Sequence, residues 1–392
     1  MNNPSNSNQK LIEEIKARQL FYQTTDGKET TAITGVYCGF DATAISLQIG
    51  NLLCISLLRL FDKHNVPTIA LLGGATTRAG DPVGKMETRK KLANTQIYEN
   101  LNGIKAQLKQ LLPNAKILNN ASWLDELKFT HFLELVAHHT PVSALLKLET
   151  FANRLKNNDS LNMQELLYPL MQGYDFLWLY EHENCNAEFG GADQWCNILA
   201  GVDLIKKKHE EAKAVGFTIP LLTTPDGKKM GKSVKGAIYL DKNLCSPYDF
   251  WQFWRNIDDS LAKPCLKKFT LIDVEEIDAI TDINQAKIML ANDITTWIHG
   301  KEAADNAETQ AKSLFIERNL ENLQAVEAIG NKLVEIMIQV KSCETNSQAK
   351  TLIEQNAVKI DDIIINEKTH AIKPGEHSLS VGKKKFYKII VA

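Results

Sequence analysis

Between residue 36 and about residue 227, short apolar runs alternate with segments of helical periodicity, and this alternation constrains the fold more than any other feature. Residues 68–74 form one such run, which ends in two glycines. Residues 52–64 before it have helical periodicity, and Pro67 marks the break. Strands that alternate with helices build βαβ units. We therefore predict an α/β domain on a parallel sheet.

Further segments extend this domain and follow it. Residues 129–155 carry Leu and Val at three-to-four spacing, which predicts inserted helices. Residues 246 to about 314 have a nearly all-helical pattern. From about residue 325 we predict a small α+β unit, with a helix at 348–354, strands at 358–360 and 363–365, and more strand-like alternation over 378–391. A length of 392 residues fits two or three domains.

Composition excludes several classes of protein. The formal net charge is −2, so any nucleic-acid contact must use local basic patches. The seven cysteines include no Cys-x-x-Cys pair, which argues against a zinc site or a disulfide framework and suits a reducing compartment. The polar N-terminus, of which we expect residues 1–8 to be disordered, lacks the apolar core of a signal peptide. The longest apolar stretch, 52–60, is too short to span a bilayer. We expect a cytoplasmic protein with no membrane partner.

Two lysine-bearing and glycine-bearing segments are candidates for phosphate binding. Residues 227–233 read GKKMGKS and residues 80–86 read GDPVGKM, and both fail the spacing of a P-loop. Lys229 and Lys232 nevertheless flank Gly231, and lysine supplies a compact positive charge that could close over a triphosphate. Taken alone, this segment fits a solvated basic loop at least as well as it fits a phosphate-binding loop.

Residues 37–51, which read YCGFDATAISLQIGN, make the phosphate interpretation stronger. Gly39 permits close approach of a ligand to the backbone, and Asp41 and Thr43 stand at a helix start, where amide dipoles favour an anion. Gly50 lies in the first turns of the helix that follows, where glycine costs about 1 kcal/mol relative to alanine. Close packing or a ligand is therefore expected beside it.

A third group of residues is the most discriminating. Tyr168, Gln172 and Asp175 stand at i, i+4 and i+7, so one helical face presents a phenol, an amide and a carboxylate. Because the surrounding residues are largely apolar, these polar groups are expected to be buried, and a polar ligand could pair with them. Residues 190–195, GGADQW, form a glycine-rich turn shortly downstream.

In order and spacing, these segments resemble those of the bacterial tyrosyl-tRNA synthetase family of class I aminoacyl-tRNA synthetases, over essentially the whole chain. The resemblance implies a Rossmann-like catalytic domain at 9–227, with an insert at about 125–160 that forms a homodimer interface. It further implies a signature loop and helical anticodon-binding domain at 228–320 and a C-terminal RNA-binding module at 325–392. The implied reaction is ATP-dependent activation of L-tyrosine and its transfer to the 3′ end of tRNA-Tyr, with Mg²⁺ accompanying ATP and no metal ligated by the protein.

The resemblance also assigns roles to individual residues. Tyr37 and Asp175 would bind the phenolic hydroxyl of tyrosine, Asp81, Tyr168 and Gln172 its ammonium group, and Gln194 the carboxylate and ribose. The ATP site would comprise Cys38, Gly39, Asp41, Thr43, Gly50, Asn51, Gly191 and Asp193. Catalytic contacts to the phosphates would come from Thr43, Gln48, Lys85, Arg89, Lys229, Lys232 and Ser233. Contacts to tRNA are expected from Lys350, Lys359, Lys383, Lys384 and Lys385.

The chain departs from the family pattern at several positions. Gln48 and Asn51 replace the histidines of the first signature, and both amides remain neutral hydrogen-bond donors. Glu188 stands where the family often has glutamine, and Asn356-Ala357 interrupts the usual glycines of a C-terminal turn.

Three other functions remain open at this level. The first is a non-catalytic tRNA- or RNA-binding relative that has lost adenylation, to which Gln48 and Asn51 point. The second is the same chemistry with tryptophan, although a phenol suits Tyr37 and Asp175 better than an indole does. The third is a small-molecule nucleotidyltransferase, which would leave the helical and C-terminal regions unexplained.

Overall fold

The computed structural model describes residues 4–27, 31–82, 92–147, 149–225, 227, 230–233, 236–321, 325–361, 363–382 and 385–391. The chain forms two compact units, 1–305 and 306–392, and helix α15 (Lys301–Glu321) contains the boundary between them. Each unit is described by itself below.

The first unit is built on a six-stranded sheet in the order β1-β6-β5-β2-β3-β4. The strands are β1 (Gln23–Thr24), β2 (Val36–Asp41), β3 (Thr68–Gly73), β4 (Lys116–Asn119), β5 (Ala187–Gly191) and β6 (Val215–Ile219). All neighbouring pairs are parallel except β1 with β6. The five parallel strands follow the doubly wound order, which confirms the predicted Rossmann-like class.

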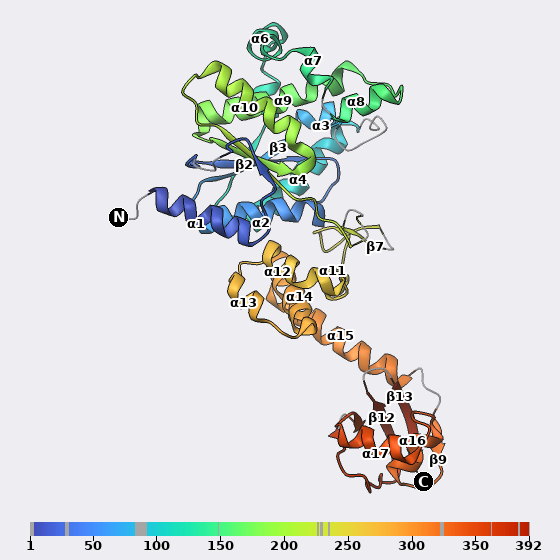
Figure 1. Ribbon diagram of the computed structural model, residues 1–392. Helices are drawn as coiled ribbons and strands as arrows, with labels where there is room; N and C mark the ends of the chain where they lie inside the picture. The colour runs from blue at the N-terminus through green and yellow to red at the C-terminus, as the bar shows by residue number, and fades with distance from the viewer. Residues whose placement is uncertain are drawn as a thin grey trace. The chain divides into compact units, whose positions relative to one another are not determined.

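Helices cover both faces of this sheet, as βαβ connections require. Helix α2 (Ile49–Lys63) packs on β2 and β3, and α10 (Trp195–Lys208) packs on β5 and β6 from the opposite face, next to α9 (Met163–Glu183) (Figure 1). Helix α4 (Asn94–Leu111) connects β3 to β4, and α1 (Pro4–Ala17) precedes the sheet. Helix α1 begins at Pro4, within the segment 1–8 for which we predicted disorder.

The inserted segment consists of short helices rather than long ones. They are α5 (Ala121–Leu124), α6 (Phe129–Leu135), η1 (Ala137–His139), α7 (Val142–Leu145) and α8 (Glu149–Lys156). Residues 129–155 are therefore largely helical, as predicted, but they form several short helices instead of longer ones. Pro141 disfavours the helical conformation in the residue before it, and Thr140 is extended, with φ −121° and ψ 102°.

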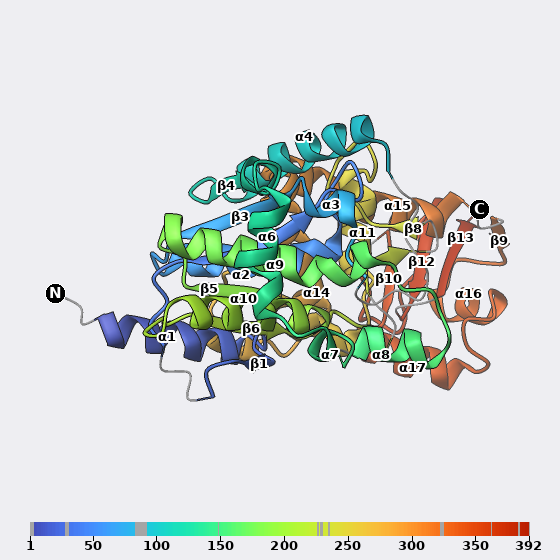
Figure 2. The same cartoon turned by 90° about the horizontal axis from the view of Figure 1, so that it is seen from above.

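The helical region of the first unit follows the sheet domain. It contains α11 (Pro247–Arg255), η3 (Asp259–Leu261), α12 (Ala262–Phe269), α13 (Val274–Ala279) and α14 (Ile283–His299). A buried arginine joins α1 to this region: the Arg18 guanidinium donates hydrogen bonds to the carbonyls of Lys267, Thr270 and Ile272 at 2.9–3.1 Å. Figure 2 shows the same cartoon from above, with the sheet and helices of the first unit labelled.

The second unit is α+β, as predicted. Its sheet has the order β11-β10-β12-β13-β9, formed by β9 (Val326–Ala328), β10 (Val358–Ile360), β11 (Ile363–Ile364), β12 (Gly375–Val381) and β13 (Lys385–Val391). Helices α16 (Leu333–Gln339) and α17 (Asn346–Glu354) share one apolar core with it. Asn356 has φ 55°, a conformation that asparagine tolerates better than most residues, so it can replace the expected glycine in this turn.

Candidate active site

The largest group of predicted site residues surrounds a cavity of about 250 Å³ beside the carboxyl ends of β2 and β5. These two strands are neighbours, and the chain runs from β2 through β3 and β4 on one side and returns at β5 on the other. Doubly wound sheets bind ligands at this switch point, because the connections leave it in opposite directions. The predicted residues that line the cavity are Tyr37, Cys38, Gly39, Asp41, Thr43, Asn51, Asp81, Tyr168, Gln172, Asp175, Gly191 and Gln194.

One end of the cavity is built around the buried carboxylate of Asp175, which is 2% exposed. Its Oδ2 accepts a hydrogen bond from Asn120 Nδ2 at 2.8 Å, and its Oδ1 accepts one from Trp123 Nε1 at 2.7 Å. Burial raises the pKa of Asp175 to about 8, although both of these hydrogen bonds oppose the change. Because both donors can only donate, they hold the carboxylate in an orientation suited to its ionised form.

Tyr37, on β2, brings a second polar group to this end. Its ring is 1% exposed and lies 5.4 Å from the ring of Phe176, centroid to centroid. Its hydroxyl makes no hydrogen bond of good geometry within the described part of the chain, although the Glu188 carboxylate lies near enough to interact with it. Burial raises the pKa of Tyr37, and the nearby charges of Glu188 and Asp175 raise it further. An unpaired buried hydroxyl next to a carboxylate is a site where a ligand hydroxyl would recover lost hydrogen bonds.

Helix α9 presents its polar stripe to the cavity as its spacing predicts. Tyr168 donates a hydrogen bond from its hydroxyl to Asp41 Oδ2 at 3.1 Å, and burial followed by the charge of Asp41 raises the pKa of this phenol. Gln172 donates from Nε2 to Glu188 Oε1 at 2.9 Å. An asparagine cap starts the helix, since the Asn162 side chain accepts from the backbone of Glu165. The phenol, amide and carboxylate therefore face one cavity.

A second polar network closes the side of the cavity near β5. Gln194 follows that strand and donates from Nε2 to Asp81 Oδ2 at 2.8 Å. Asn197 donates to Gln194 Oε1 at 2.9 Å, which fixes the orientation of the glutamine amide. A Cβ on Gly191 would lie 2.7 Å from Asp193 Oδ1, so a side chain there would require the Asp193 carboxylate to move. Asp193 therefore lies directly behind Gly191, although it does not line the cavity itself.

The other end of the cavity is the N-terminus of α2. The Asn51 side-chain oxygen accepts from the backbone N–H of Gln48 at 3.0 Å, so this oxygen caps the helix and the Nδ2 group is the donor that remains for a ligand. A Cβ on Gly50 would meet no atom within 4 Å, so close protein packing does not explain this glycine. An exposed glycine at a helix N-terminus suits approach by a phosphate. Gln48 and Gly50 themselves lie at the rim, outside the cavity lining.

The structure also brings to this helix the described part of residues 227–240, which we call the second signature segment. The backbone N–H of Ile49 donates to Ile238 at 3.1 Å, and that of Leu240 donates to Leu47 at 2.9 Å. Gly231 lies beside the same helix start, with its Cβ position 3.8 Å from the Gly50 nitrogen. Two segments almost two hundred residues apart in the chain therefore meet where a phosphate would bind.

Several predicted cations cannot be placed in this site. Lys85, Arg89 and Lys229 lie outside the described residues, as do Lys383 and Lys384. Lys232 and Ser233 form strand β7, which pairs with β8 (Gly236–Ala237), and only their backbone is described. In the second unit, Lys350, Lys359 and Lys385 are exposed, and Lys385 donates to the Ser342 carbonyl at 2.8 Å.

Sequence reasoning missed three residues that hold carboxylates of the cavity in place. Asn120 and Trp123 hold Asp175, and Thr76 donates to Asp41 Oδ1 at 2.9 Å. Their position was a usable signal, because Thr76 follows the glycines that end β3, and Asn120 directly follows β4. Polar residues just after parallel strands meet at the ligand-binding edge of such a sheet.

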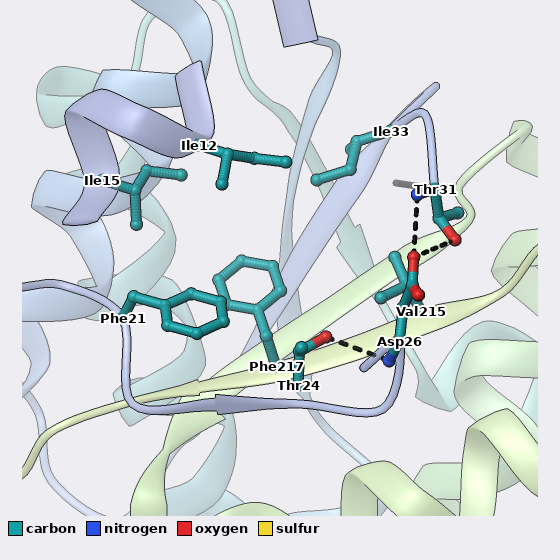
Figure 3. Close-up of a pocket in the computed structure, with 9 residues that line it drawn as sticks. All are labelled: Ile12, Ile15, Phe21, Thr24, Asp26, Thr31, Ile33, Val215 and Phe217. Carbon is teal, nitrogen blue, oxygen red and sulfur yellow. Dashed lines mark hydrogen bonds between the residues drawn. The ribbon is translucent and has the colours of Figure 1, made fainter. Parts of the chain in front are cut away.

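A second hollow lies away from this site, between α1, β1 and β6 (Figure 3). Apolar side chains such as Ile12, Ile15 and Phe217 surround it, and its volume is about 30 Å³. Its polar neighbours are bonded to one another: Thr31 donates to Asp26 from its backbone and its hydroxyl. This hollow has room for little more than a water molecule and offers no reactive group.

Neither a metal centre nor a membrane span occurs in the part of the chain that is described. No group of three or more His, Cys, Asp or Glu side chains among those residues could hold a metal ion. No helix there is both long and apolar enough to cross a membrane.

The family model for class I tRNA synthetases of the tryptophan and tyrosine type matches residues 29–316. The match covers the five parallel strands, the cavity and the helical region, and the chain belongs to this family of aminoacyl-tRNA synthetases.

Within this family, the chain is similar to tyrosine–tRNA ligases and to a solved tyrosyl-tRNA synthetase. The chain is 40% identical to a tyrosine–tRNA ligase of Pelagibacter ubique over 405 aligned positions, which cover 97% of this chain and 99% of that protein. It is 39% identical to a tyrosine–tRNA ligase of Clostridium kluyveri, with 93% of each chain covered. Among solved structures, a C-terminally truncated mitochondrial tyrosyl-tRNA synthetase of Aspergillus nidulans superposes with a TM-score of 0.69 at 27% identity, covering 78% of this chain and 94% of that one.

Proposed function

We propose that the protein activates L-tyrosine with ATP and transfers the tyrosyl group to the 3′ end of tRNA-Tyr. The observation that carries this proposal is one cavity with two different ends. One end holds the buried pair Tyr37 and Asp175, and the other is the open N-terminus of α2 beside the second signature segment. The tyrosine–tRNA ligases among its relatives match the chain over nearly its full length.

Tyrosine would bind with its phenol toward Asp175. The hydroxyl of the substrate would donate to the ionised carboxylate, and Tyr37 would supply a further hydrogen-bonding group. Phenylalanine would leave these buried groups unpaired. A site built to hydrogen-bond a substrate hydroxyl strongly rejects the analogue that lacks it, because the buried polar groups then lose their partner. An indole would place no hydroxyl there, which disfavours tryptophan.

The ammonium and carboxylate groups would lie between the two ends. Asp81, Tyr168 and Gln172 would surround the ammonium group, and the carboxylate would face the nucleotide beside Gln194. A carboxylate oxygen attacks the α-phosphorus of ATP, the bond to the β-phosphate bridging oxygen breaks, and tyrosyl-adenylate and pyrophosphate form. A ribose hydroxyl of the tRNA then attacks the acyl carbon and AMP leaves.

The protein's own residues would accelerate these steps by positioning and by charge. Backbone N–H groups at the start of α2 and the Asn51 amide would bind phosphate oxygens. Lys229, Lys232 and Ser233 would neutralise the departing pyrophosphate, together with Lys85 and Arg89, and Mg²⁺ would enter with ATP. Gln48 and Asn51 supply neutral donors where histidines are usual, so we do not propose the non-catalytic alternative.

Three further proposals concern the homodimer, the contacts with tRNA and the cellular compartment. The short helices of the insert expose Phe129, Leu133, Val142 and Leu155 by 42–69%, which suits burial in a homodimer. Exposed Lys350 and Lys359 suit contact with the tRNA backbone, and we propose that the helical region reads the anticodon. The protein would act in the cytoplasm.

Charging of tRNA tests the whole proposal. Purified protein, ATP, Mg²⁺, labelled tyrosine and tRNA-Tyr should give acid-precipitable tyrosyl-tRNA. Protein that binds the tRNA but charges none of it would support the non-catalytic alternative instead.

A further inference from the structure

Glu188 is a buried carboxylate that the proposed mechanism does not use. It lies on β5, is 1% exposed and does not line the cavity. Its Oε1 accepts the hydrogen bond from Gln172 Nε2 at 2.9 Å, and its Oε2 makes no hydrogen bond within the described residues. Gly201 of α10 leaves room for it, since a Cβ there would lie 3.2 Å from Oε2.

The chemistry of this pair determines how Gln172 is oriented. An ionised carboxylate can only accept hydrogen bonds, so Gln172 must direct its NH₂ group toward Glu188. The carbonyl oxygen of Gln172 is then the end of the amide left for the cavity, where an ammonium group needs an acceptor. A glutamine at position 188 could either donate or accept, and would permit both orientations of the Gln172 amide.

We infer that Glu188 is a positioning residue, which holds Gln172 so that its carbonyl oxygen faces the ammonium group of the amino-acid substrate. This inference rests on the proposed function, because it takes Gln172 as a contact to that group. It assigns a role to a buried carboxylate that the proposed mechanism does not otherwise use.

Protonation of Glu188 would remove this constraint. Burial raises the pKa of Glu188 to about 7, and the hydrogen bond from Gln172 and the nearby Tyr37 hydroxyl oppose this rise. The titratable groups facing it are Tyr37 and Cys38 from β2, Asp175 from α9, and Cys185 from the turn before β5. None of these four is a cation. Below the pKa, a protonated Glu188 can also donate to Gln172, so the flipped amide becomes accessible and binding of the ammonium group weakens.

Two small ligands isolate the ammonium group. Tyramine carries the phenol and the ammonium group, and 4-propylphenol replaces the ammonium group by a methyl group of similar size. Calorimetric titration of the whole protein with each ligand, without ATP or tRNA, gives the preference for tyramine independently of turnover. Wild-type protein should prefer tyramine; the absence of any preference would contradict the proposed ammonium site itself and with it this inference.

Substitution then tests Glu188 alone. In Glu188→Gln, we expect the Kd of tyramine to rise by about tenfold, the effect of about 1.4 kcal/mol on a binding constant, and that of 4-propylphenol by less than about twofold. In a Gln172→Ala background, Glu188→Gln should leave the Kd of tyramine almost unchanged, because the amide that Glu188 orients is absent. The matched control is Glu165→Gln, which neutralises another buried carboxylate of the domain, paired with Arg154, and should leave the preference unchanged.

The wild-type pH profile provides a second, substitution-free measurement. For a pKa of about 7, the preference for tyramine over 4-propylphenol should fall by up to about tenfold between pH 8 and pH 6. Because both ligands carry the phenol, titration of Asp175 affects them alike. Two results would overturn the inference. One is an unchanged Kd of tyramine in Glu188→Gln. The other is an equal effect of Glu188→Gln on this Kd in the wild-type and in the Gln172→Ala background.

Discussion

The hydrogen bond from Trp123 to Asp175 offers a quantitative test of the tyrosine end of the cavity. Trp123→Phe removes the indole donor 2.7 Å from Asp175 Oδ1 and keeps an aromatic ring to stack on Trp178, whose ring centroid lies 4.1 Å away. A hydrogen bond to a charged group is worth about 1.5–3 kcal/mol. Its loss therefore raises the pKa of Asp175 further and disfavours the ionised form.

The size of the effect depends on pH. The pKa of Asp175 is about 8, so at pH 7 the ionised fraction should fall by about 10- to 150-fold. At pH 9 the wild-type carboxylate is mostly ionised, and the deficit should shrink to about 2- to 15-fold. If the phenol of tyrosine donates to the ionised carboxylate, as we propose, KM for tyrosine should rise by these factors while kcat changes little.

Tyrosine-dependent exchange of labelled pyrophosphate into ATP, at both pH values, measures this effect. Trp178→Phe is the matched control, because it disturbs the same ring stack and leaves the indole donor to Asp175 in place. A KM defect of equal size at pH 7 and pH 9, or one shared by Trp178→Phe, would refute the reasoning.

Three further substitutions test other parts of the account. Gly50→Ala should raise stability by up to about 1 kcal/mol, since the site is open, and raise KM for ATP; an unchanged KM would mean that no phosphate approaches this backbone. Arg18→Met leaves three carbonyl groups without their donor and should lower the free energy of unfolding by about 3–5 kcal/mol in chemical denaturation, and a loss below about 1 kcal/mol would mean that Arg18 does not join α1 to the helical region. Glu188 has a raised pKa, so its stabilising contribution is complete below pH 4.5 and is lost as the pH rises through about 7. Glu188→Gln should therefore gain Tm relative to wild type as the pH is raised from 6 to 8.5, and a constant Tm difference would contradict the shifted pKa.

The elements of the sheet domain could be predicted because their patterns are local. Strand β3 is buried along its full length and reads as an unbroken apolar run, and the apolar residues of α2 repeat at helical spacing. The break at Pro141 was also local, but the surrounding Leu and Val spacing suggested longer helices than the insert contains. Sequence periodicity does not show where tertiary packing ends a helix.

The site was harder to predict wherever it depends on contacts between distant segments. The i, i+4, i+7 spacing placed Tyr168, Gln172 and Asp175 on one face, and all three line the cavity. Trp123 could not be assigned, because its bond to Asp175 spans more than fifty residues and its position does not directly follow a strand. Glu188 was recognised as unusual, but only the structure shows that it accepts from Gln172.

The central claim is that one cavity selects tyrosine and joins it to AMP. Pyrophosphate–ATP exchange without tRNA, run in parallel with tyrosine, tryptophan and phenylalanine, tests it most directly. The account predicts exchange with tyrosine and almost none with the other two, because only tyrosine brings a hydroxyl to Asp175. Exchange with tryptophan at a comparable rate, or no exchange with any of the three from folded protein, would contradict it.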